Sequence, residues 1–178
     1  FAFLFLKLAE SGISGHNGLI KGHTMNTTHS SNSRSPLIVV GDIMLDKYVQ
    51  GSVSRISPEA PVPVVHVKQE SLSIGGAGNV ANNLAHLGAS PVLIGTIGKD
   101  AHGAELQRLC KKQNISLLAF EHDQPTITKM RIIGEHQQVA RVDYEIPSLS
   151  PASVLKLIKK NISGMSSEPV IVISDYGK

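Results

Sequence analysis

Three runs of apolar, largely β-branched residues alternate with two helical patterns, and this alternation constrains the fold most. The runs are LIVVGDIML (37–45), PVLIGTIG (91–98) and ISLLAFEH (115–122). Nearly continuous apolar runs are typical of strands that are buried on both faces of a parallel sheet. Helical spacing over 79–87 and 100–114 separates them, so the middle of the chain predicts a β-α-β-α-β unit with right-handed crossovers. The sequence therefore favours an α/β fold with a doubly wound sheet.

The ends of the predicted helices carry residues that match known capping preferences. Gly88 follows the first helix at the position where a C′ glycine is common, and Asp100 is placed to cap the second. Ser150 and the proline after it predict the start of a third helix. A last buried strand is predicted within VIVISDYGK (170–178), with Asp175 at its end.

Two segments depart from this alternation of strands and helices and favour antiparallel β structure. KYVQGSVSRI (47–56) is followed by PVPVVHVK (61–68), whose two prolines predict an edge strand or an extended arm. TITKMRIIGEHQQVARVDYE (126–145) reads as a hairpin that turns at 134–136.

Composition narrows the classes of function. The net charge is +3 and Lys and Arg are scattered, which argues against a nucleic-acid partner. Hydrophobic residues make up 41% of the chain, too few for a membrane bundle. The single cysteine, Cys110, excludes an internal disulfide and favours the cytoplasm. The eight histidines form no cluster with metal-ligand spacing, so no metal site is predicted.

The first 35 residues differ from the rest. FAFLFLKLA (1–9) is too short to span a bilayer, and it lacks the basic segment that precedes a signal-peptide core. The residues that follow are rich in Gly, Ser, Thr, Asn and His, a composition that does not bury enough surface to fold. We expect 1–35 to be a disordered leader, with 1–24 foreign to the native protein; a remnant secretion signal is the alternative.

The stretch SIGGAGNVANNLAHLG (73–88) offers more than one interpretation. From Gly76 it reads G-A-G-N-V-A, which fits a dinucleotide-binding turn, with Asp100 about twenty residues on. That fingerprint belongs to the first strand-turn-helix of a domain, whereas these glycines follow the predicted edge ribbon. A simple tight turn before a helix is a second interpretation.

A polar ligand site is a third interpretation of the same glycines. Gly75 and Gly76 let the backbone approach a ligand, and the helix start directs free N–H groups at it. Asn79 adds an amide with donors and an acceptor. Asp46 and Asp175 follow predicted strands at the same sheet edge, so a site that reads hydroxyl groups is expected there.

These residues carry a family resemblance. The run from Gly75 to Ala81, followed by Gly88 and Gly98, resembles the first signature of the ribokinase-like (PfkB) carbohydrate kinases. VVGDIMLDKYVQGSVSRISPEAPVPVV, PTITKMRII, QQVARVDYE and SDYGK look like the kinase domain of bacterial heptose-7-phosphate kinases. In many bacteria that domain is the N-terminal half of a bifunctional enzyme with an ADP-heptose synthase. The likeness runs over 36–178.

The resemblance implies a ribokinase-like doubly wound sheet with a small β lid, of which 36–178 are the N-terminal, sugar-binding part. The whole enzyme would transfer the γ-phosphoryl group of ATP to the anomeric oxygen of D-glycero-β-D-manno-heptose 7-phosphate, in ADP-heptose and lipopolysaccharide core synthesis. A homodimer formed through the lid is also implied.

The resemblance also implies roles for single residues. Asp46 matches the family's sugar-hydroxyl acceptor, and Gly75, Gly76 and Asn79 match the turn that grips the sugar. Three cations are candidates for the 7-phosphate, with a solvated strand face as the alternative: Arg55, Lys129 and Arg131. Two residues would end a strand that faces the site, Asp175 and Lys178, and Lys178 would approach the transferring phosphoryl group.

The catalytic part of the family pattern is absent from the printed residues. The family's catalytic base lies in a Gly-Ala-Gly-Asp helix start, and its ATP pocket and magnesium-linked motif also lie in the second half of the domain. We therefore expect no catalytic residue in this chain, ATP and Mg²⁺ only in the full-length enzyme, and no turnover by the chain alone. Alternatives are another ribokinase-like sugar kinase, a non-catalytic sugar-binding or dimerising fragment, and a dinucleotide-binding oxidoreductase.

Overall fold

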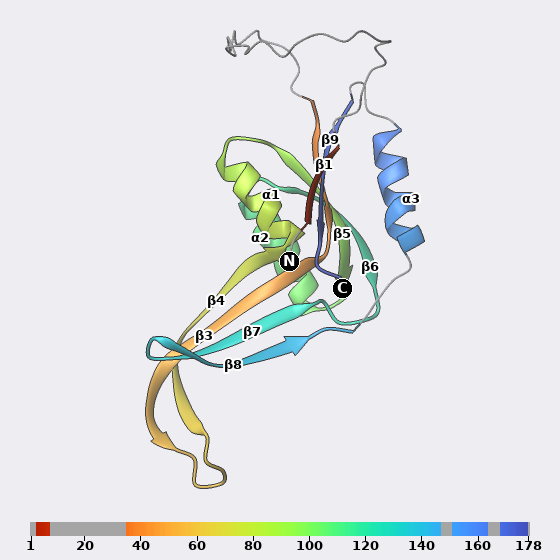
Figure 1. The fold of residues 1–178 in the computed structure, drawn as a ribbon. Helices are drawn as coiled ribbons and strands as arrows, with labels where there is room; N and C mark the ends of the chain where they lie inside the picture. Colours follow the sequence, from red (N-terminus) through yellow and green to blue (C-terminus); the bar gives the residue numbers. More distant parts are fainter. Residues whose placement is uncertain (1–2, 8–34, 147–150, 164–167, 178) are drawn as a thin grey trace, which may run out of the picture.

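A five-stranded sheet forms the body of the protein (Figure 1). The computed structural model describes residues 3–7, 35–146, 151–163 and 168–177. The strands of this sheet lie in the spatial order β1 (Phe3–Lys7), β9 (Val170–Asp175), β2 (Leu37–Gly41), β5 (Pro91–Gly98) and β6 (Ser116–His122). The last four are parallel, as the sequence predicts, and β1 runs antiparallel to β9.

Helices cover both faces of this sheet (Figure 1). They are α1 (Ala77–His86), α2 (Ala101–Lys112) and α3 (Pro151–Ile162). Side chains alternate along β2: Val39 packs in the core cluster with residues of α1 and α2, while Ile38 and Val40 pack with residues of α3. The predicted doubly wound α/β architecture is confirmed.

The helix ends confirm two of the predicted caps. The Asp100 side chain accepts a hydrogen bond from the Gly103 N–H at 2.7 Å. Gly88 has φ +85°, and the N–H groups of Gly88 and Ala89 reach back to the α1 carbonyls of Ala85 and Leu84, which closes a Schellman motif. Helix α1 begins at Ala77, two residues before the predicted start, and Ser150 lies outside the described residues.

The prediction of one strand over 37–45 is wrong. Strand β2 ends at Gly41, and β3 (Ile43–Ile56) belongs to a second sheet. The chain passes from one sheet to the other at Asp42. The Asp42 carbonyl accepts a hydrogen bond from the Ala77 N–H at 2.8 Å, and Oδ2 of Asp42 accepts one from the Tyr176 N–H at 2.8 Å. These bonds hold Asp42 at the carboxyl edge, so Asp46 lies inside β3 rather than at the end of the first strand.

The second sheet forms the predicted lid, which extends from the carboxyl ends of the parallel strands (Figure 1). Its spatial order is β4 (Pro63–Gly76), β3, β7 (Thr128–Gly134) and β8 (Gln137–Tyr144). Strands β3 and β4 form a long antiparallel pair, β7 lies parallel to β3, and β8 completes the predicted hairpin with β7. As the prolines indicate, β4 lies at an edge.

The expected disorder of the leader is wrong for residues 3–7. They form β1, which pairs with β9 from Phe3–Asp175 to Lys7–Ile171. An apolar, β-prone segment has a physical reason to pair there, because the outer edge of β9 otherwise presents unpaired backbone groups. Residues 8–34 lie outside the described part. Among the described helices, none has both the length and the apolar character needed to cross a bilayer.

Candidate functional site: a glycine turn beneath a charged lid face

The glycine turn joins β4 to α1 and brings the backbone close to two aspartates. A Cβ atom at Gly76 would lie 2.2 Å from the Asp42 carbonyl oxygen, and Gly76 has φ +61°, so only glycine fits there without strain. A Cβ at Gly75 would lie 2.5 Å from Oδ2 of Asp46. Gly75 therefore provides the space that the Asp46 carboxylate occupies.

Arg131 fixes the Asp46 side chain from the neighbouring strand. Nη1 of Arg131 donates to Oδ1 of Asp46 at 2.5 Å, and the exposed fractions of the two side chains are 24% and 17%. The hydrogen bond to Asp46 raises the pKa of the Arg131 guanidinium above its usual value. The guanidinium carbon also lies 5.2 Å from the centre of the Tyr48 ring, a cation–π contact that further orients it.

One side of the lid carries the ion pairs of Lys129, Arg131 and Arg141. The Lys47–Glu70 pair, at 2.8 Å, lies on the other side. Register pairs share a face of a sheet, so the residues of the pairs Asp46–Lys129, Lys129–Asp143 and Arg131–Arg141 all lie on the first side. We call this side the charged lid face; it consists of Asp46, Tyr48, Lys129, Arg131, Arg141 and Asp143. The predicted placement of Lys129 and Arg131 on one side is confirmed.

Lys129 is the more enclosed of the two predicted lid cations. Its side chain is 11% exposed, and Nζ lies 3.1 Å from Oδ2 of Asp143 and 3.3 Å from Oε2 of Glu145. Arg141 also binds Asp143 through two hydrogen bonds, at 2.9 and 2.8 Å. The hydrogen bond from Arg141, followed by that from Lys129, holds the pKa of Asp143 below its usual value. Carboxylates therefore already neutralise these cations.

Two further predicted residues, Asn79 and Asp175, lie at the carboxyl edge of the sheet. Asn79 is the third residue of α1, in the turn whose N–H groups lack intrahelical acceptors, and its side chain is exposed. Asp175 ends β9 and accepts from the Gly177 N–H at 2.7 Å through Oδ1. Lys178 lies outside the described residues.

Arg55 is not brought to this site within one chain. It is exposed near the far end of the β3–β4 pair, opposite Val64. Nine residues separate it from Asp46 along the same strand, which corresponds to about 30 Å at ~3.3 Å per residue. Figure 1 shows this end of the hairpin pointing away from the body.

Asp100, the acidic residue that the dinucleotide interpretation needs, is bound by the protein itself. Oδ1 of Asp100 accepts from the Gly103 N–H and, at 2.7 Å, from the Thr126 hydroxyl, and its Oδ2 accepts from the Thr126 N–H at 2.8 Å. A carboxylate with both oxygens occupied by the protein is not placed to bind a ribose. Asp100 instead has a structural role, since it caps α2 and binds Thr126.

The described residues do not fit a magnesium ion. Within them, no group of three or more His, Cys, Asp or Glu side chains lies close enough together to hold a metal. The acids of the charged lid face are bound to cations instead. These acids are therefore not available as magnesium ligands in this arrangement.

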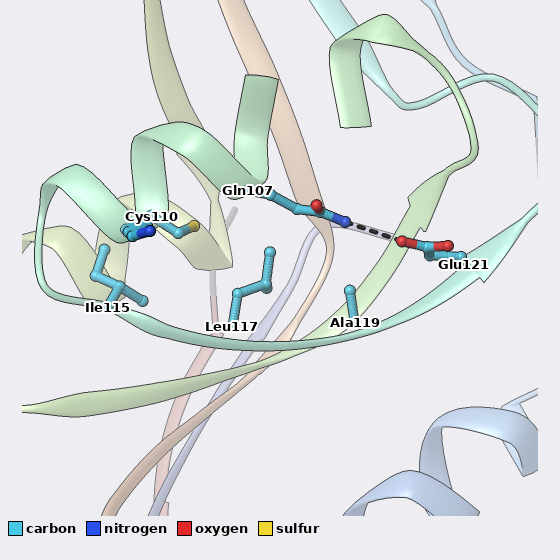
Figure 2. Close-up of a pocket in the computed structure, with 7 residues that line it drawn as sticks. Gln107, Cys110, Ile115, Leu117, Ala119 and Glu121 are labelled. Carbon is cyan, nitrogen blue, oxygen red and sulfur yellow. Dashed lines mark hydrogen bonds between the residues drawn. The ribbon is translucent and has the colours of Figure 1, made fainter. Parts of the chain in front are cut away.

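A separate hollow of about 380 Å³ lies between α2 and β6. Figure 2 shows Gln107 reaching across it to Glu121, with 2.9 Å between Nε2 and Oε1. The labelled lining residues are Gln107, Cys110, Ile115, Leu117, Ala119 and Glu121. None of the predicted site residues lines this hollow, so the site and the hollow are distinct. Burial raises the pKa of the Cys110 thiol to about 11, which argues against a reactive thiolate.

Sequence reasoning missed the partners that orient the site. Asp42 is the polar residue that interrupts the first apolar run, and it marks the change of sheet. Asp143 and Arg141 lie opposite Lys129 and Arg131 only because the hairpin contains a register shift between Ile132 and Ile133, which the sequence does not indicate. Tyr48 had no comparable signal, since its contact with Arg131 depends on the side-chain geometry.

A doubly wound sheet with a β lid at its carboxyl edge, and a glycine turn between lid and helix, defines the ribokinase-like class of α/β proteins. A model of the pfkB family of carbohydrate kinases matches residues 35–161. The chain belongs to this family.

Similar proteins agree with that assignment, and a solved structure shares the fold. The chain is 43% identical over 148 residues to "Bifunctional protein HldE" of Hydrogenovibrio crunogenus, a match that covers 82% of this chain and 30% of that protein. It is 42% identical over 147 residues to the D-beta-D-heptose 7-phosphate kinase of Bordetella bronchiseptica, covering 82% of this chain and 47% of that protein. The chain thus spans a third to a half of these relatives. Phosphofructokinase-2 from Escherichia coli, solved with fructose-6-phosphate, superposes with a TM-score of 0.60 at 23% identity, over 79% of this chain and 45% of that one.

Proposed function

We propose that residues 36–178 form the sugar-phosphate-binding part of a heptose-7-phosphate kinase. The observation that carries this proposal is the Asp46 carboxylate, which Arg131 holds in the space left by Gly75, next to the start of α1. A fixed carboxylate beside free helix N–H groups suits a polyhydroxylated ligand. The likeness to the heptose 7-phosphate kinase of Bordetella bronchiseptica supports the choice of substrate.

Each residue of the site has a proposed task. Asp46 accepts a sugar hydroxyl, and the turn at Gly75 and Gly76 lets the sugar approach the amide of Asn79. Lys129 and Arg131 meet the 7-phosphate. Because both cations are paired with carboxylates, the phosphate would have to share or replace those partners, and we expect a dissociation constant on the order of 1 mM for the chain alone.

Phosphoryl transfer needs groups that these residues do not supply. In the proposed whole enzyme, ATP donates its γ-phosphoryl group to the anomeric oxygen of D-glycero-β-D-manno-heptose 7-phosphate. Such transfer requires positioning and charge neutralisation together. The printed sequence holds no Gly-Ala-Gly-Asp run. We therefore infer that residues 36–178 alone bind the sugar phosphate without turning over ATP, and we expect this to take place in the cytoplasm.

The other side of the lid favours self-association, in line with the alternative of a dimerising fragment. The strand register places on this side Val67, Leu72, Met130, Ile132, Val142 and Tyr144, which we call the apolar lid face. The Lys47–Glu70 ion pair also lies on this side. Val67 is 54% exposed and Tyr144 is 48% exposed. Exposed apolar side chains gathered on one face favour an interaction site, and the self-complementary contact of a two-fold dimer would cover them.

Analytical ultracentrifugation tests the dimer. Val142→Asp should lower the association constant at least tenfold, because it places a charge in the proposed interface. Leu87→Asp is the matched control, since Leu87 is 83% exposed at the end of α1, outside the lid. A monomeric wild-type protein at ~100 μM, or equal losses in the two variants, would refute this surface.

Titration followed by NMR tests the binding proposal. Heptose 7-phosphate should shift the amide signals of Asp46 and of residues 75–79, with an apparent Kd near 1 mM. Asp46→Asn should weaken binding about tenfold or more, because an amide replaces the charged acceptor. Unchanged affinity in that variant would remove Asp46 from the site, and NAD binding at the same amides would favour an oxidoreductase.

A further inference from the structure

A buried polar cluster lies where the body of the protein passes into the lid. Its centre is Thr126, which is 1% exposed. The Thr126 hydroxyl donates to Oδ1 of Asp100 at 2.7 Å and accepts from the Gly98 N–H at 2.9 Å, while the Thr126 N–H donates to Oδ2 of Asp100 at 2.8 Å. Asp100 thus joins the start of α2 to the segment that leads into β7.

A second pair of residues, Thr128 and His102, extends this junction to the start of β7. Thr128, the first residue of β7, is fully buried, and its hydroxyl donates to the Thr126 carbonyl at 3.1 Å. The same hydroxyl also lies within hydrogen-bond distance of Nδ1 of His102, at 3.0 Å. We call Asp100, His102, Thr126 and Thr128 the junction cluster.

The backbone is closely packed at this junction. A Cβ at Gly103 would lie 2.2 Å from the Gly98 carbonyl oxygen. A Cβ at Gly98 would lie 2.4 Å from the Gln124 carbonyl oxygen and 2.6 Å from the Thr126 nitrogen. Strand β5, the start of α2 and the approach to β7 are therefore in direct backbone contact.

The junction cluster lies immediately before the charged lid face. The Leu45 N–H donates to the Ile127 carbonyl at 2.9 Å, and the next register pair is Asp46 with Lys129. A slip of β7 by one residue would turn Lys129 and Arg131 to the other face of the lid. Whatever fixes Thr126 and Thr128 also fixes where Arg131 meets Asp46.

We infer that Asp100 is a positioning residue of the lid site: through Thr126 it sets the register of β7 against β3, and thereby holds Arg131 against Asp46. The inference concerns the protein alone, and it stands whether or not the ligand is a sugar phosphate. It also gives the acidic residue of the apparent dinucleotide fingerprint a different task.

Asp100→Asn separates this task from helix capping. Asparagine caps helices about as well as aspartate, so the bond from the Gly103 N–H is kept. The new amide nitrogen cannot accept from the Thr126 N–H, so two donors face each other. Asp123→Asn is the matched control, because Asp123 lies in the same connection, with its side chain 91% exposed and paired only with Lys99 among the described residues.

Amide hydrogen exchange of the whole chain provides the readout. In Asp100→Asn, the Leu45 amide and the amides of β7 should exchange roughly 10–100 times faster, while the buried Ile94 amide of β5 should keep its wild-type rate. The side-chain NMR signal of the Arg131 guanidinium should lose the shift caused by Asp46. Asp123→Asn should leave all three unchanged.

Substitutions of the partner residue complete the test. Thr126→Val, which removes the hydroxyl, should accelerate the same lid amides, and Thr126→Ser, which keeps it, should restore wild-type exchange. Equal acceleration at Ile94 and in the lid would mean a general structural role and would overturn the inference. An unaltered Arg131 signal in Asp100→Asn would overturn it as well. Since no ligand is present, neither outcome bears on the proposed function.

Discussion

Gly75→Ala is the most informative single substitution in the site. Its Cβ would lie 2.5 Å from Oδ2 of Asp46, well inside van der Waals contact, so the carboxylate must move. The Asp46 side chain is short and Arg131 holds it at its other oxygen. A rotation that relieves the contact therefore breaks this ion pair.

The expected magnitudes follow from that pair. A hydrogen bond between charged groups contributes about 1.5–3 kcal/mol, and alanine in a strand recovers about 0.5–1 kcal/mol relative to glycine. The free energy of unfolding should fall by roughly 1–2 kcal/mol, equivalent to about 5 °C in Tm for a domain of this size. If Asp46 binds a sugar hydroxyl, the affinity should fall roughly tenfold or more.

Urea denaturation and an NMR titration with heptose 7-phosphate measure the two effects. Gly88→Ala serves as the control, because nothing lies within 4 Å of its added Cβ and it is far from Asp46 in the fold. It should lose some stability through its φ of +85° and keep its affinity. The reasoning is refuted if Gly75→Ala retains both the wild-type affinity and the Arg131–Asp46 pair.

Three further predictions concern stability and reactivity. Gly76→Ala should lower the free energy of unfolding by about 2–4 kcal/mol in urea, against about 1 kcal/mol for Gly88→Ala, because it adds a backbone clash to a positive φ; equal losses would contradict this. Cys110 should react with a thiol reagent at pH 8 at least a hundred times more slowly in the native than in the unfolded protein, and fast native labelling would contradict its burial. For Asp100, burial raises the pKa, but the hydrogen bonds from Thr126 and Gly103 outweigh it and lower the pKa overall. Its stabilisation is therefore complete above the unfolded pKa of about 3.9 and is lost as pH falls through the folded value, so the stabilities of wild type and Asp100→Asn should converge as the pH is lowered below both values.

Local patterns in the sequence predict much of the fold. The parallel strands follow from the apolar runs, the caps at Gly88 and Asp100 follow from residue type, and the lid hairpin follows from its turn. The break at Asp42 was missed because the apolar pattern resumes directly after this single polar residue. The antiparallel pairing of β1 was missed because it depends on an open edge far away in the sequence.

The sequence predicts the residues of the candidate site better than it predicts the side chains that bind those residues. The glycines and Asp46 follow from a motif, and the common side of Lys129 and Arg131 follows from strand alternation. Their neutralisation by carboxylates depends on register between strands, which a single sequence does not specify. Arg55 shows the limit of the same reasoning, since its strand is long enough to carry it about 30 Å away.

One measurement tests the central claim directly: an NMR titration of the wild-type chain with D-glycero-β-D-manno-heptose 7-phosphate, with NAD as the competing ligand. The account predicts saturable shifts at Asp46, at the amides of 75–79 and at Lys129, with an apparent Kd near 1 mM, and none there with NAD. Shifts confined to other residues, or NAD shifts at the glycine turn, would contradict it.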